Sequence, residues 1–183
     1  MQINSLFSKR YALLLGFSGW FLLFSLLLRI VFLLWQLNDL DLSIFSLLKI
    51  LGTGLVFDVG VLSFLFVISS LYILIIPQKW IGSTLDKIAI YFGFSLTLLI
   101  FVFTFFAEIT FWEEFKCRFN FVAVDYLIYT FEVVQNIHES YPLYILIPSM
   151  LIITGFIFYY FWKKQFFSYT FSTKISFKNR FIT

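Results

Sequence analysis

Residues 11–35 read YALLLGFSGWFLLFSLLLRIVFLLW, an apolar run interrupted by a single charge, Arg29. A helix needs roughly 20 mostly apolar residues to cross the hydrocarbon core of a bilayer. The basic pair Lys9 and Arg10 precedes the run. The run is too long for the apolar core of a signal peptide and has no small-residue cleavage site. It therefore predicts a membrane span that is retained in the protein.

The composition of the whole chain supports the same interpretation. Of the 183 residues, 61% are hydrophobic and only 13% are charged, and the mean hydropathy is +0.96. A soluble domain of this size could not cover so much apolar side chain with so little polar surface. The 28 phenylalanines suit lipid-facing and inter-helix packing and argue against a disordered or nucleic-acid-binding protein. We therefore expect an all-α, polytopic membrane helix bundle that forms a single membrane domain over residues 1–183.

Three further apolar runs have the length of a span, at residues 57–76, 88–107 and 143–162. The first of these runs belongs to a longer apolar stretch, residues 43–76, which is too long for one upright helix across the bilayer. We expect a separate interfacial or re-entrant piece at residues 43–56, joined to the span at Gly52 and Gly54 because glycine marks breaks in helices. The prediction is thus about four transmembrane helices.

Basic and acidic residues alternate along the connections between the spans. The basic positions are Lys9, Arg10, Lys79 and Lys87, followed by Lys163, Lys164, Lys174, Lys178 and Arg180 in a tail over residues 163–183. The acidic positions are Asp39, Asp41 and the acidic-rich segment over residues 111–142. Under the positive-inside rule, this pattern predicts a bacterial cytoplasmic-membrane protein with both termini cytoplasmic. The tail suits topology and contact with anionic lipid rather than nucleic acid.

Arg29, Asp58 and Glu108 lie inside or at the edge of apolar runs. With a rise of about 1.5 Å per residue, each lies roughly 27–30 Å from the cytoplasmic edge of its span. An unpaired charge there costs about 2 kcal/mol or more. The sequence therefore predicts an ion pair between Arg29 and Asp58, with Glu108 near it. The alternative is that each charge extends to the lipid headgroups on its own.

The outer segment over residues 111–142 combines charge with aromatic residues. Its apolar positions at helical spacing are Phe115, Phe119, Val122, Tyr126 and Tyr129, which predicts amphipathic helices on the outer membrane surface. The candidates for headgroup binding or domain docking are Arg29, Asp58, Glu108, Glu114, Arg118, Asp125, Tyr126, Glu132 and Glu139. The alternative is a solvated face with an interfacial aromatic belt. One cysteine and one histidine, Cys117 and His138, exclude a thiolate zinc site or a His-rich metal site.

Two stretches carry a resemblance to a known family. EFKCRFNFVAVDYLIYTFEVVQNIHESYP, residues 114–142, and GLVFDVGVL, residues 54–62 with Asp58, resemble the membrane region of lipoteichoic acid synthase-like phosphoglycerol transferases of the sulfatase/alkaline phosphatase superfamily. The resemblance implies a membrane helix bundle that anchors a large extracytoplasmic catalytic domain. That domain would use a threonine nucleophile and manganese or magnesium to transfer phosphoglycerol, or a related group, from a lipid.

The chain ends at Thr183 without such a domain, so we expect a membrane anchor that is inactive alone. It would present a lipid headgroup, with anionic phospholipid as partner, and would hold no cofactor itself. Either the chain is a truncated gene product or fragment, or a separately encoded sulfatase-like chain docks onto residues 111–142. The alternative is a free-standing lipid-binding or assembly subunit. A small transporter is disfavoured because no ionisable residue is expected near the bilayer midplane.

Overall fold

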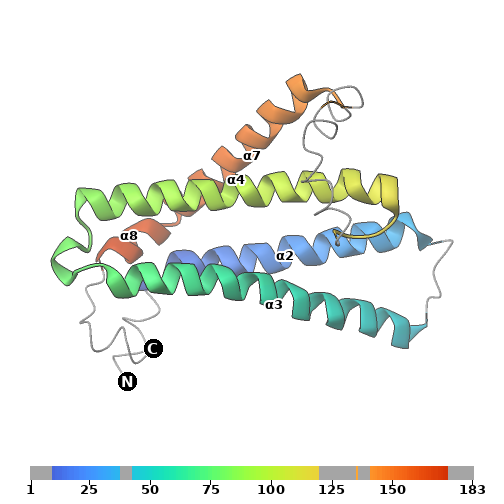
Figure 1. The fold of residues 1–183 in the computed structure, drawn as a ribbon, viewed down its shortest axis with the longest axis horizontal. Coiled ribbons are helices and arrows are strands. Elements are labelled where there is room, and N and C mark those ends of the chain that lie inside the picture. The colour runs from blue at the N-terminus through green and yellow to red at the C-terminus, as the bar shows by residue number, and fades with distance from the viewer. Residues whose placement is uncertain (1–9, 38–42, 120–134, 136–140, 173–183) are drawn as a thin grey trace. The chain divides into compact units, whose positions relative to one another are not determined.

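The computed structural model describes residues 10–37, 43–119, 135 and 141–172. Over these residues the chain is helical and contains no strand, which confirms the all-α prediction (Figure 1). Four helices are long and apolar enough to cross a membrane: α2 (Ala12–Trp35), α3 (Ile44–Ile75), α4 (Thr84–Phe115) and α7 (Leu143–Lys163). Helices of this kind indicate a multi-pass membrane protein.

The bounds of α2 and α7 follow the predicted spans to within one residue. Pro148 lies inside α7 and the helix continues through it. In contrast, α4 has 32 residues and extends past the predicted span at both ends. At 1.5 Å per residue it measures about 48 Å, against roughly 30 Å of hydrocarbon. Its ends therefore reach the headgroup regions or the helix tilts.

The predicted break at Gly52 and Gly54 is wrong, because α3 runs without interruption for 32 residues from Ile44 to Ile75. A glycine within a helix costs only about 1 kcal/mol, whereas a break inside a bilayer would expose backbone groups that lipid cannot satisfy. Residues 43–56 are therefore not a separate re-entrant piece. Asp58 consequently lies near the middle of α3, about 21 Å from Ile44 by helical rise.

The chain divides into two compact units, Met1–Lys87 with Lys164–Thr183, and Ile88–Lys163. In the first unit, α2 packs against α3 and against α8 (Phe166–Ser172). The core of this unit includes Phe17, Phe32 and Phe167, all buried. In the second unit, the ring of Phe94 in α4 meets Phe161 of α7 edge-on at 5.0 Å between centroids.

A tight turn joins α3 to α4 within the first unit. It contains the 3-10 helix η2 (Gln78–Trp80) and Gly82, whose φ is +78°. A Cβ added at Gly82 would lie 3.0 Å from the carbonyl oxygen of Phe171 in α8. Glycine is therefore required here both for its backbone conformation and for the close approach of α8.

Candidate functional site

An ion pair joins α2 to α3 in the interior of the first unit. Arg29 Nη2 lies 2.6 Å from Asp58 Oδ2, and each residue is only 5% exposed. Ser25 Oγ donates a hydrogen bond of 2.8 Å to Asp58 Oδ1. The predicted pairing of Arg29 with Asp58 is therefore confirmed, and the alternative in which each extends separately to the headgroups is wrong.

The guanidinium of Arg29 lies directly against the backbone of α3. Its Nη2 donates a 2.6 Å hydrogen bond to the carbonyl oxygen of Gly54, and a Cβ added at Gly54 would overlap the guanidinium. Asp58 Oδ2 has no hydrogen-bond partner besides this ionic contact. Gly54 thus provides the space and one acceptor, while Asp58 provides the negative charge that compensates the charge of Arg29 among apolar helices.

A second ion pair lies at the end of α4, in the second unit. Arg118 donates from Nε at 3.2 Å and from Nη2 at 2.9 Å to Glu108 Oε1, and from Nη2 to Oε2 at 2.7 Å. The Glu108 side chain is 10% exposed and that of Arg118 is 32% exposed. The sequence identified both residues but did not pair them. The expectation that Glu108 lies near Arg29 and Asp58 stays a prediction.

The chain folds back after α4 and thereby places Arg118 beside Glu108. Lys116 has a φ of +53° and its backbone N–H donates to the carbonyl oxygen of Trp112 at 2.9 Å, which ends the helix. The ring of Phe111 then contacts Phe119 at 5.1 Å between centroids. This aromatic contact holds the residues that follow α4 against the last turns of that helix.

Acidic groups lie at the same end of α4. Glu113 and Glu114 are exposed. Burial raises the pKa of Tyr141, and the negative charges of Glu113 and Glu114 raise it further. Tyr141 also hydrogen-bonds Glu113, so the residues just before α7 lie beside the end of α4. The remaining candidates Asp125, Tyr126, Glu132 and Glu139 lie outside the described residues.

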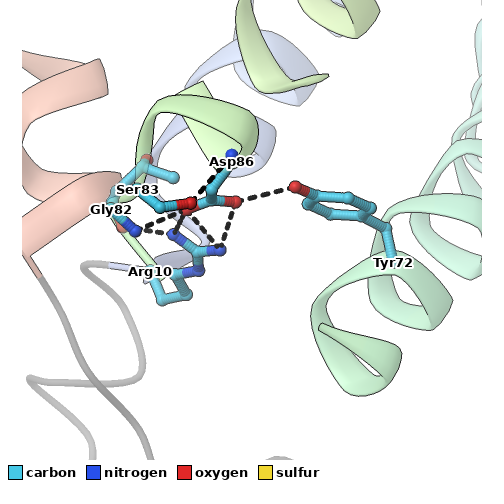
Figure 2. A network of polar contacts seen from close by, with 6 residues as sticks. Arg10, Tyr72, Gly82, Ser83 and Asp86 are labelled. Carbon is cyan, nitrogen blue, oxygen red and sulfur yellow. Dashed lines mark hydrogen bonds and ion pairs between the residues drawn. The ribbon is translucent and has the colours of Figure 1, made fainter. Parts of the chain in front are cut away.

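A third ion pair, which the sequence did not predict, lies in the first unit (Figure 2). Arg10 Nη2 is 3.2 Å from Asp86 Oδ1, and each residue is 1% exposed. Arg10 Nη1 also donates to the carbonyl oxygen of Thr170 in α8 at 2.8 Å. Arg10 therefore connects the start of α2 to the α3–α4 turn and to the segment after α7.

Two other groups donate hydrogen bonds to the Asp86 carboxylate. The hydroxyl of Tyr72 donates to Oδ1 at 2.7 Å and the backbone N–H of Gly82 to Oδ2 at 2.8 Å. The backbone N–H of Asp86 in turn donates to Ser83 Oγ at 3.3 Å. Serine followed three residues later by an acidic residue is the pattern of a helix N-terminal cap. This spacing was visible in the sequence and could have identified Asp86.

No protein-family model, curated protein or solved structure matches this chain. The resemblance to phosphoglycerol transferases therefore stays a prediction. Within the described parts of the chain, no group of three or more His, Cys, Asp or Glu residues could hold a metal ion.

Ionisable residues lie within the length of α3. Asp58 lies near the middle of a continuous α3, and Lys49 is an exposed charge within the same helix. The absence of ionisable residues from the centre of the spans is therefore not an argument against a transporter. The buried pairing of Asp58 with Arg29 favours a structural role, because each charge compensates the other.

Proposed function

We propose that this chain is the membrane domain of a lipoteichoic acid synthase-like phosphoglycerol or phosphoethanolamine-type transferase, and that it presents a lipid headgroup at the end of α4. The observation that carries the proposal is the pairing of Arg118 with Glu108 at that helix end. Four helices of spanning length support the anchoring role. The resemblance of residues 114–142 supports the assignment to that class of enzyme.

The arrangement at the end of α4 suits one part of a phospholipid in particular. Arg118 is held in place by Glu108, yet its side chain stays 32% exposed. A fixed and partly exposed guanidinium is a good donor to a phosphate group, since ionic hydrogen bonds of this kind are strong and directional. Lys116, also exposed, adds a second positive charge near it.

The carboxylates restrict which headgroup fits. Lys116 and Arg118 are outnumbered by Glu108, Glu113 and Glu114 among the described residues at this end. A headgroup with donors of its own can place its phosphate on Arg118 and direct its hydroxyl or ammonium group toward Glu113 and Glu114. A glycerol or ethanolamine headgroup has such donors. A choline headgroup has none, and a bare phosphate would be repelled.

The test compares phosphatidylethanolamine with phosphatidylcholine, which have the same net charge and differ in their N–H donors. The chain is reconstituted in nanodiscs containing both lipids, extracted into mild detergent, and its retained lipids are quantified by mass spectrometry. We expect enrichment of phosphatidylethanolamine, reduced about tenfold by Arg118→Gln because a hydrogen bond to a charged group contributes about 1.5–3 kcal/mol. Lys49→Gln is the matched control and should retain the enrichment. Equal retention of both lipids by the unmodified chain would contradict the headgroup role.

The anchoring role is tested separately, by purifying the tagged chain from its native membranes. Recovery of a sulfatase-like catalytic chain, active with manganese or magnesium, would support a split enzyme. Recovery of the lipid-binding chain alone would favour the free-standing subunit. We expect no turnover of a phosphatidylglycerol analogue by the purified chain, and measurable turnover would overturn the assignment of catalysis to another domain.

A further inference from the structure

The end of the first unit that carries the α3–α4 turn exposes lysines and aromatic rings. We define the basic face as Lys79 and Trp80 in the turn, Lys87 at the start of α4, and Lys164 and Tyr169 before and within α8, the helix whose residues Thr170 and Phe171 contact Arg10 and Lys87. All three lysines are exposed, and Trp80 and Tyr169 are 47% and 45% exposed. Within α4, Lys87 belongs to the first turns of the helix, whereas Arg118 follows its last residue, Phe115.

Burial of the carboxylates leaves this face positive. Asp58 and Asp86 are the carboxylates among the described residues of the first unit, and both are buried. Asp86 is also neutralised by Arg10. A net charge counted along the sequence would include Asp86 with Lys79 and Lys87, and would give this surface a smaller positive charge. The structure removes Asp86 from the surface, so the charge that remains exposed there is that of the lysines.

The basic face lies at the level of the headgroups if α3 and α4 cross the bilayer. Its turn connects Ile75, the last residue of α3, to Thr84, the first residue of α4. Tryptophan and tyrosine are favoured at this depth because one part of each side chain is apolar and another is polar. We propose that the basic face binds anionic phospholipid, with the lysines contacting phosphate groups and Trp80 and Tyr169 at the boundary of the hydrocarbon.

The components of the face are held together rather than merely adjacent in sequence. Arg10 bonds the Thr170 carbonyl oxygen and Asp86, and therefore fixes α8 against the turn. Lys87 Nζ lies 6.0 Å from the centre of the Phe171 ring. Because α8 and the turn are fixed in this way, the lysines do not have to be brought together when a lipid binds. Less ordering on binding favours affinity.

The experiment compares phosphatidic acid with phosphatidylcholine. Phosphatidic acid carries negative charge but lacks the hydroxyl or ammonium donors that we propose bind Glu113 and Glu114 beside Arg118. The full chain is reconstituted in nanodiscs containing both lipids, and retained lipids are quantified by mass spectrometry after detergent extraction. The variant is the triple substitution Lys79→Gln, Lys87→Gln and Lys164→Gln. A lysine near an anionic surface contributes about fivefold in affinity. We therefore expect the enrichment of phosphatidic acid to fall by up to about a hundredfold.

Three further variants separate the possible outcomes. Lys49→Gln and Arg118→Gln should each retain the enrichment, and a triple Lys→Arg variant should retain it as well. Unchanged enrichment in the triple Lys→Gln variant would overturn the proposal. So would an equal loss in the triple Lys→Arg variant, because arginine keeps the positive charge at each position. Thermal unfolding of each variant in detergent confirms that the comparison is made between folded proteins.

Discussion

At the scale of single residues, the most buried charges of the described residues occur in pairs. Arg29 and Asp58 are 2.6 Å apart and nearly inaccessible. Removal of one member leaves the other charged, buried and without compensation, which costs about 3–5 kcal/mol. We therefore expect Arg29→Gln to lower the free energy of unfolding by that amount, measured by titration from mild detergent into dodecyl sulfate.

The same pair offers its own control. Replacing both members with leucine removes the uncompensated charge and should restore most of the lost stability, since an apolar pair of similar volume often equals a buried ion pair. If Arg29→Gln and the double leucine variant unfold at the same dodecyl sulfate concentration as the unmodified chain, the pair has no structural role.

At the scale of helices, the approach of α2 to α3 depends on Gly54. Alanine is a better helix former than glycine by about 1 kcal/mol, so propensity alone predicts that Gly54→Ala stabilises the protein. A Cβ at Gly54 overlaps the Arg29 guanidinium and would displace it from the Gly54 carbonyl oxygen. We expect the displacement to outweigh propensity, and Gly54→Ala to destabilise the protein by about 1–3 kcal/mol, the cost of an unsatisfied buried group.

Gly52 is the matched control on the same helix, because nothing lies within 4 Å of an added Cβ there. Gly52→Ala should stabilise the protein by about 0.5–1 kcal/mol through helix propensity. Opposite signs for Gly52→Ala and Gly54→Ala in dodecyl sulfate unfolding would support the argument. Stabilisation by both substitutions would show that Arg29 moves without cost.

At the scale of the whole molecule, the question is which side of the membrane each end occupies. Four helices of spanning length predict that both termini lie on one side, and the basic residues of the terminal segments predict that this side is cytoplasmic. Green fluorescent protein fused after Thr183 should fluoresce, and alkaline phosphatase inserted near His138 should be active, since the latter folds only outside the cytoplasm. An inactive phosphatase near His138, or one active after Thr183, would contradict this topology and both lipid proposals that depend on its two membrane surfaces.

Hydropathy was sufficient to locate the four long helices of the described residues, although not the full extent of α3 and α4, because a bilayer needs long apolar segments and these are contiguous in the chain. The bounds of α2 and α7 and the all-helical class follow from it. The pairing of Arg29 with Asp58 could also be predicted, because a rigid helical rise converts residue number into depth.

Sequence patterns could not assign partners that depend on how the chain turns and on which helices meet. Arg10 was assigned only a role in topology, and Asp86 was not recognised, yet tertiary contacts bury them against each other and against Thr170. Glu108 finds Arg118 only because the chain reverses at Lys116. Hydrophobic burial acts on whole segments and is readable along the chain, whereas ionic contacts act over a few ångströms and depend on three-dimensional packing.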